Sequence, residues 1–236
     1  MTSRKQPHDA AAALPARGLY PTVAISDAFN TVTHALAAIA LAQLAPTSAH
    51  RADLAAVGFA SVAFAATLGT LRFGLSEYHF AAVNGATAHF AAYVGLPLVG
   101  FAAATSSALS NGPQSSWCAP LTSVLSNVDP ALFTVALSWI CLLSTNTFAA
   151  ALEDLVKVLL NVVLFIWPVA ALGLHHSDRA LLAYLGLFVF AGVVIKPERE
   201  KLLFGVRREN WFHYGIGIAS MGMAYRLAAI LAGGGK

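Results

Sequence analysis

Charged residues are scarce in this chain. Asp, Glu, Lys and Arg make up 11% of its 236 residues, whereas 58% of the residues are hydrophobic. An ordinary soluble domain carries about 25% charged residues, and so few charges cannot cover so much apolar side chain in water. The composition excludes a soluble globular enzyme, a disordered chain and a nucleic-acid-binding domain, and it indicates a polytopic α-helical membrane protein.

Cysteines and targeting signals are also scarce. Cys118 and Cys141 are too few for a disulfide framework or a cysteine-based zinc motif. Residues 1–20 lack the apolar core of a signal peptide, and the chain has no Asn-x-Ser/Thr sequon. We expect a bacterial inner membrane or a eukaryotic plasma membrane or endomembrane; Asp9 and the nearby prolines disfavour a mitochondrial presequence.

Seven stretches of the chain approach the length of about 20 apolar residues that spans a bilayer. They are residues 22–45, 52–74, 80–104, 130–150, 152–174, 179–195 and 210–232. The sequence therefore predicts an all-α bundle of seven transmembrane helices over residues 22–232, between an N-terminal segment, 1–21, and a tail, 233–236. A tight turn near Ala151 and Leu152 is expected to separate the fourth and fifth helices.

The distribution of Lys and Arg predicts the orientation, because cytoplasmic loops carry more of them. An inside N-terminus leaves only Arg51, Arg179 and Lys236 outside, and it places the C-terminus outside. The polar loop 105–129 is then outside and is expected to have little regular structure. The charged loop 196–209 is inside, where a short amphipathic helix would lie on the membrane surface.

The first predicted helix carries the most specific local pattern. Asp27, Asn30, Thr31 and His34 stand at positions i, i+3, i+4 and i+7, so they share one helix face. A hydrogen-bonded stripe between helices is one explanation. Packing between helices needs only small or hydroxyl side chains, however, and the combination of a carboxylate with an imidazole favours a functional site.

Further polar side chains fall toward the inner ends of the predicted helices. Such residues are costly in a membrane and usually face the bundle interior or a watery cavity. We therefore predict a polar cavity on the cytoplasmic side, with His89 about 15 Å along its helix. Glu153 and Lys157 are expected to pair with each other at i, i+4. The remaining candidates are Arg72, Glu77, His79, Asn146, Asp154 and His213.

Three short motifs resemble one superfamily. Ser26-Asp27 followed by Asn30-Thr31-Val32-Thr33-His34 resembles the first-helix motif of progestin/adiponectin-type receptors. Asn210-Trp211-Phe212-His213-Tyr214 is similar to the histidine-bearing last helix of the same superfamily, which includes alkaline ceramidases. The run from Leu68 to Gly74 is similar to a second-helix Gly-x-x-x-His-Gly pattern of small uncharacterised seven-helix relatives, although Arg72 stands where a histidine would be.

The resemblance implies a seven-helix bundle with a three-histidine zinc site that hydrolyses a lipid amide. In such a site, zinc lowers the pKa of a bound water to about 7, and the resulting hydroxide attacks the carbonyl. His213, with His34 or His89, would hold the zinc ion. Asp27 would orient a ligand or act as general base, and Arg72 would bind an anionic lipid head group.

The chain departs from that superfamily at two positions, so other functions stay open. Besides Arg72, Gly217 stands where the last helix usually has a second histidine. A non-catalytic relative without metal is one alternative, and an accessory or structural subunit of a larger membrane complex is another. A small proton-coupled transporter with a relay of Asp27, His34 and His89 is the third. The expected partners are membrane lipids and other proteins of a membrane complex, and not nucleic acid.

Overall fold

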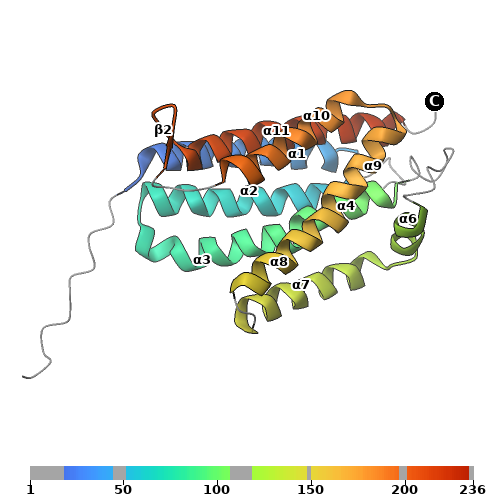
Figure 1. The fold of residues 1–236 in the computed structure, drawn as a ribbon, viewed down its shortest axis with the longest axis horizontal. Helices are drawn as coiled ribbons and strands as arrows, with labels where there is room; N and C mark the ends of the chain where they lie inside the picture. Colours follow the sequence, from blue (N-terminus) through green and yellow to red (C-terminus); the bar gives the residue numbers. More distant parts are fainter. Residues whose placement is uncertain (1–18, 45–51, 107–118, 148–149, 197–200, 234–236) are drawn as a thin grey trace, which may run out of the picture.

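The computed structural model describes residues 19–44, 52–106, 119–147, 150–196 and 201–233. Most of the expected N-terminal segment 1–21, most of the expected tail 233–236 and the central part of loop 105–129 lie outside these ranges. The described chain is helical apart from one small hairpin (Figure 1). Its elements are α1 (Pro21–Ala42), α2 (Ala52–Gly74), α3 (Glu77–Phe90), η1 (Ala91–Gly95), α4 (Leu96–Ala104), α6 (Ala119–Ser126), α7 (Pro130–Thr147), α8 (Ala150–Asn161), η2 (Val162–Ile166), α9 (Trp167–His175), α10 (Arg179–Phe190), η3 (Ala191–Ile195), β1 (Leu202–Leu203), β2 (Val206–Arg207) and α11 (Arg208–Gly233).

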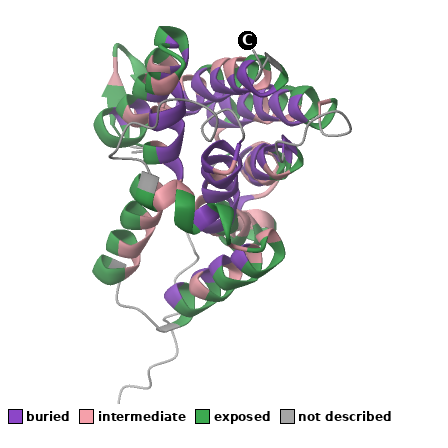
Figure 2. Ribbon diagram, turned by 90° about the vertical axis from the view of Figure 1, so that its right-hand side faces the viewer, coloured by how far each residue is buried: buried purple, intermediate pink, exposed green. Residues whose placement is uncertain are grey.

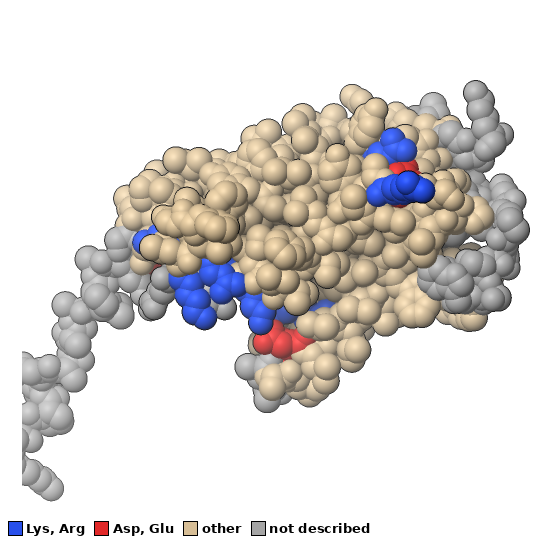
Figure 3. Space-filling view, turned by 45° about the horizontal axis from the view of Figure 1, so that its top comes forward, with Lys and Arg blue, Asp and Glu red and all other residues tan. Residues whose placement is uncertain are grey.

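Several of these helices are long and apolar enough to cross a membrane. Five continuous helices meet that condition among the described residues, and the pair α6–α7, bent by 105°, makes up to six. The helix Arg179–Ile195 is apolar but shorter. On the face shown in Figure 3, Lys, Arg, Asp and Glu gather in separate groups, and most of the surface is uncharged. The expected all-α polytopic membrane protein agrees with this fold.

The first and last helices pack together in the main core. α1 lies against α2 and α11, and α10 packs on α11. Their contact surfaces are built from small and aliphatic residues, together with Phe59 of α2 and Phe165 of η2. A second cluster joins α4 to α6 and α7 through Phe101 and Phe133. Figure 2 shows the buried residues where the helices meet and the exposed residues on outward faces.

Three of the long helices contain a five-residue π-helical segment: η1, η2 and η3. Two of these segments come just before a proline, Pro97 in the first turn of α4 and Pro168 in the first turn of α9. Proline has no backbone N–H to donate to the preceding turn. The helix therefore changes its hydrogen-bond register here instead of ending.

Glycines let two helix pairs approach closely. A Cβ placed on Gly58 of α2 would lie 2.5 Å from the carbonyl oxygen of Gly95 in η1. A Cβ on Gly100 of α4 would overlap the carbonyl oxygen of Leu164 and lie 2.6 Å from Cα of Phe165, both in η2. Small residues at such crossings allow backbone contact in membrane proteins.

Three local predictions are wrong. Ala151 and Leu152 lie inside α8, which begins at Ala150, and not in a turn. The loop expected outside contains a helix, α6, over Ala119–Ser126. In the charged loop expected inside, residues 202–207 form a β-hairpin and not an amphipathic helix.

The hairpin has a two-residue turn at Phe204 and Gly205. Both residues have positive φ, 52° and 76°, as a type I′ turn requires. Leu202 pairs with Arg207 and Leu203 with Val206. With such a turn inside the segment, the chain reverses direction before a helix can form. Trp211 of α11 donates its indole N–H to the Leu203 carbonyl at 2.9 Å and holds the hairpin on that helix.

A buried carboxylate ties α10 to α11 at the opposite end of the bundle. Asp178 caps α10 by accepting a hydrogen bond from the Leu181 amide at 2.9 Å. Its other oxygen accepts from Nε and Nη2 of Arg226, at 2.8 and 2.6 Å. Burial alone would raise the pKa of Asp178, but the bonds from Arg226 and the backbone outweigh it and hold this pKa below its usual value.

Replacing Gly100 with Ala is expected to destabilise the fold by about 1–3 kcal/mol, because the added methyl group must displace the backbone of η2. Gly186 of α10 is the matched control, since a Cβ there meets nothing within 4 Å. Thermal unfolding in detergent measures both variants. A Gly100→Ala midpoint as high as that of Gly186→Ala would contradict the close crossing.

Acid should weaken the α10–α11 connection. Because the pKa of Asp178 is lowered in the fold, its stabilisation is complete above the ordinary Asp value of about 3.9 and is lost as pH falls through the lower native pKa. Asp178→Asn keeps a capping side chain and removes the charge, so this part of the acid dependence should disappear. Asp178→Ala should cost about 1 kcal/mol more than Asp178→Asn through the lost cap. Unfolding midpoints measured between about pH 3 and 7 test both expectations. Parallel pH profiles for the wild type and Asp178→Asn would contradict the expected loss of acid dependence.

Candidate functional site

A cavity of about 520 Å³ lies among α1, α2, α3, α8, α10 and α11. Its size is within the range of small-molecule sites, about 300–1,000 Å³. Val62, Leu96, Phe188 and Ile216 form part of an apolar wall. Polar groups enter from four of the helices. They are Asp27, Asn30, Asn84, Lys157, Asn161, Glu209 and His213.

The polar end of this cavity is built around His213 of α11. Its Nδ1 lies 3.2 Å from Oδ1 of Asp27 and 3.0 Å from Oγ of Ser26, both on α1. Ser26 Oγ donates to the Val23 carbonyl at 2.9 Å, so it accepts from the imidazole. These contacts place a proton on Nδ1. In the neutral form of the ring, Nε2 is the acceptor nitrogen.

Two glycines make room for this arrangement. A Cβ on Gly69 of α2 would overlap Oδ2 of Asp27, so the buried carboxylate occupies the space of the missing side chain. A Cβ on Gly217 would lie 2.7 Å from Thr33 Oγ1, which brings α11 close to α1 one turn beyond His213. Asp27 is only 4% exposed. Burial of a carboxylate is costly unless it is paired, and the imidazole supplies a partner.

Two of the π-helical segments line the cavity, and the third begins next to it. Ala91 and Ala92 of η1 and Gly192 of η3 line it, and Asn161 lies immediately before η2. Asn161 donates to the Ala92 carbonyl at 3.1 Å and connects η2 to η1. Its own Oδ1, like that of Asn30, is buried and has no hydrogen-bond partner among the described residues. A ligand with hydrogen-bond donors could satisfy both oxygens.

Arg72 lies behind the wall of the cavity and does not line it. Its Nη2 is 3.3 Å from Oε1 of Glu77, and its Nη1 donates to Oδ1 of Asn84 at 3.2 Å. Asn84 in turn donates to the Ala65 carbonyl at 3.0 Å and reaches the cavity. Arg72 and Glu77 therefore support Asn84 and are connected to the cavity through it.

The structure brings together part of the predicted set. Asp27 and Asn30, which share the predicted face of α1, line one cavity with His213 of α11. His34 is on the same face of α1 but does not line the cavity. It is fully buried beside Phe59, and its Nδ1 lies 2.8 Å from the Asn30 carbonyl oxygen.

The structure separates the other predicted residues from this cavity. His89 lies in a different cavity with Glu153, and Lys157 pairs with Asp154, so the expected Glu153–Lys157 pair does not form. The side chain of Asp154 is 72% exposed. The two remaining residues bond locally at the surface. Asn146 donates to the Leu142 carbonyl, and His79 contacts Ser76.

The zinc set implied by the sequence is not assembled among the described residues. No three His, Cys, Asp or Glu side chains there form a group that could hold a metal ion, whereas a catalytic zinc needs three protein ligands. His34, His89 and His213 occupy three different surroundings. We therefore derive no step through a metal.

Four polar residues that line the cavity were not among the predicted site residues: Asn84, Lys157, Asn161 and Glu209. Ser26, which contacts His213, was not predicted either. Glu209 has a sequence signal, because it stands four residues before His213 on one helix and so shares its face. Ser26 is adjacent to Asp27 and reaches His213 from the next position along α1. Asn84 carries no such signal, since its role depends on how α3 packs against α2.

Comparison with known proteins adds no identification. No family model, no curated protein and no solved structure matches the chain. The function is therefore argued from the geometry of the site.

Nitrogen NMR of histidine-labelled protein tests the imidazole geometry. In the wild type, we expect His213 to show the nitrogen chemical shifts of an imidazole that is protonated on Nδ1 and unprotonated on Nε2. Gly69→Ala, which displaces the Asp27 carboxylate, should change that resonance or mix the tautomers. His213→Gln identifies the signal, and Gly186→Ala is the control. An unchanged His213 resonance in Gly69→Ala would contradict the Asp27 contact.

Proposed function

We propose that the chain is an integral membrane protein that binds an amphipathic, lipid-like molecule in the cavity among α1, α2, α3, α8, α10 and α11. The hydrogen-bonded pair of Asp27 and His213 at the polar end of an otherwise apolar cavity is the observation that carries this proposal. The apolar walls suit a hydrocarbon chain. The polar end suits a head group that donates hydrogen bonds.

The head group should carry hydrogen-bond donors, because several cavity atoms that would meet it are acceptors. With its proton on Nδ1, His213 offers an acceptor at Nε2. The buried amide oxygens of Asn30 and Asn161 are acceptors as well. Hydroxyl and amide N–H groups complement such a set, whereas a head group with acceptors alone would leave these atoms unpaired at a cost.

We further propose seven spans, with the N-terminus in the cytoplasm and the C-terminus outside. α1, α2, α3 to α4, α7, α8 to α9, α10 to η3, and α11 would be the spans. The excess of Lys and Arg in the loops assigned to the inner side supports that direction. The cavity then opens nearer the cytoplasm, because His213 is close to the start of α11 and α11 follows the charged inner loop.

Hydrolysis of a lipid amide is a second candidate, which the Asp27–His213 pair favours. A carboxylate that orients an imidazole is a common arrangement in general-base catalysis. His213 Nε2 would take a proton from water while the water oxygen adds to the amide carbonyl, and the imidazolium would return that proton to the leaving amine. The resemblance to alkaline ceramidases supports the same substrate class.

Binding of N-hexadecanoyl ethanolamine to the purified full-length chain tests both candidates, because this probe carries an acyl chain, an amide and a hydroxyl. His213→Ala should weaken binding by about tenfold or more through the lost acceptor. Gly192→Leu should also abolish or strongly weaken it, because a Cβ at Gly192 meets nothing within 4 Å and the longer side chain would fill the cavity. Calorimetry in detergent measures the dissociation constants.

Matched controls make the result specific. Gly186→Leu adds the same side chain at an open position of α10, and His79→Ala removes an exposed imidazole from α3. Both should bind like the wild type. Equal affinity in Gly192→Leu and Gly186→Leu would overturn the cavity as the binding site. Release of hexadecanoic acid by the wild type, but not by His213→Ala, would support hydrolysis. Binding without release would support the binding function and contradict hydrolysis.

A further inference from the structure

We propose that a second cavity, between α3, α7 and α8, binds a phospholipid with a primary ammonium head group. The head group would lie against Glu153 and His89, and one acyl chain would follow the groove between α3 and α7. This site is separate from the Asp27–His213 cavity, and the proposal does not depend on the function proposed above. It assigns a partner to polar residues that the first cavity leaves unused.

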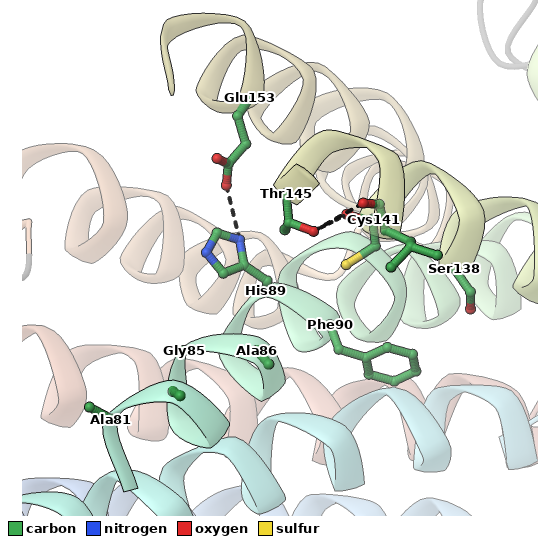
Figure 4. A pocket seen from close by; sticks show the side chains of 11 residues that line it. Ala81, Gly85, Ala86, His89, Phe90, Ser138, Cys141, Thr145 and Glu153 are labelled. Carbon is green, nitrogen blue, oxygen red and sulfur yellow. Dashed lines mark hydrogen bonds and ion pairs between the residues drawn. The ribbon is translucent and has the colours of Figure 1, made fainter. Parts of the chain in front are cut away.

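The second cavity is a groove of about 530 Å³ with a floor of very small residues. Gly85 and Ala86 of α3 face α7 across it, and Ser138 and Cys141 of α7 form the opposite wall (Figure 4). α7 packs on η1 and leaves most of α3 without a neighbour on this side. The groove exists because α3 has no large side chains where α7 diverges from it.

A carboxylate beside an imidazole closes the groove. Nδ1 of His89 lies 3.1 Å from Oε1 of Glu153, at the start of α8 (Figure 4). The nearby hydroxyl groups are used within their own helix, since Ser138 and Thr145 donate to the carbonyls of Thr134 and Cys141. The Glu153 carboxylate is therefore the main recognition group. An ammonium group complements it in charge and supplies three hydrogen-bond donors.

The position of Glu153 explains how a head group reaches it. In the seven-span arrangement proposed above, α7 ends and α8 begins on the cytoplasmic side. The Asp154 side chain, next to Glu153, is 72% exposed and pairs with Lys157. Exposed charged groups are costly in hydrocarbon, so the start of α8 would lie at the level of water and lipid head groups, where a head group can meet Glu153.

The shape of the groove favours an acyl chain over a helix of another protein. The groove ends at the Glu153 carboxylate and the His89 imidazole, and burying these polar groups under an apolar helix would be costly. A hydrocarbon chain is narrow enough to lie over Gly85 and Ala86, and it leaves the charged end to the head group.

Native mass spectrometry of the delipidated full chain tests the proposal with two probes of identical acyl chains, dioleoyl phosphatidylethanolamine and dioleoyl phosphatidylglycerol. We expect the wild type to bind the former about tenfold more tightly. Glu153→Gln should remove this preference, because the charge pairing is lost. Gly85→Leu should weaken binding of phosphatidylethanolamine about tenfold, since a Cβ there meets nothing within 4 Å and the longer side chain would occupy the groove.

Gly186→Leu is again the control and should bind both lipids like the wild type. Gly192→Leu should also leave this binding unchanged, which separates the second cavity from the first. Equal binding of the two lipids by the wild type would overturn the head-group assignment. Wild-type affinity in Gly85→Leu would overturn the location, and a dimer that Gly85→Leu disrupts would show that a helix occupies the groove.

A second measurement tests occupancy of the groove without the Gly85→Leu substitution. Cys141 lines the cavity, and in a Cys118→Ser background it is the remaining thiol of the chain. Dioleoyl phosphatidylethanolamine should slow alkylation of Cys141 by N-ethylmaleimide, whereas phosphatidylglycerol at the same concentration should have a smaller effect. Identical alkylation rates with and without phosphatidylethanolamine would contradict occupancy of the groove.

Discussion

The buried carboxylate of Asp27 imposes the strongest constraint on this bundle. An ionised group inside a membrane-spanning helix must be paired and hydrogen-bonded, and His213 of the last helix lies 3.2 Å away. The contact joins the two ends of the chain across α1 and α11. It also explains why α2 has a glycine at position 69, since a larger residue would occupy the space of the carboxylate.

The cavities follow from how the other helices surround this pair. Near Pro97 and Pro168, π-helical segments replace regular helix, and the wall of the first cavity consists partly of such irregular backbone. Backbone of this kind is tolerated at membrane depth where it is buried or lines a cavity. The chain thus holds two acid–imidazole pairs in separate surroundings: Asp27 with His213 inside the main bundle, and Glu153 with His89 in the groove beside α7.

Sequence periodicity predicted the polar face of α1 because spacing along a helix determines which residues share a face. The position of His213 at the start of the last predicted helix indicated that residue, and the composition indicated the all-α membrane fold. The sequence could not predict that His89 pairs with Glu153, or that Asn146 and Asp154 face outward, because these outcomes depend on how far α7 and α8 extend beside α3. The hairpin was missed because Phe204 adopts positive φ, a conformation that aromatic residues rarely favour.

The central claim is that the cavity beside Asp27 and His213 holds the head group of an amphipathic ligand. A lipid amide with a photoreactive diazirine next to the amide, crosslinked to the full chain in nanodiscs and mapped by mass spectrometry, tests it most directly. The account predicts adducts on cavity residues of α2 and α11, such as Ala66, Phe212 and Ile216. Adducts confined to outward-facing residues, such as Val32 and Val193, would contradict it.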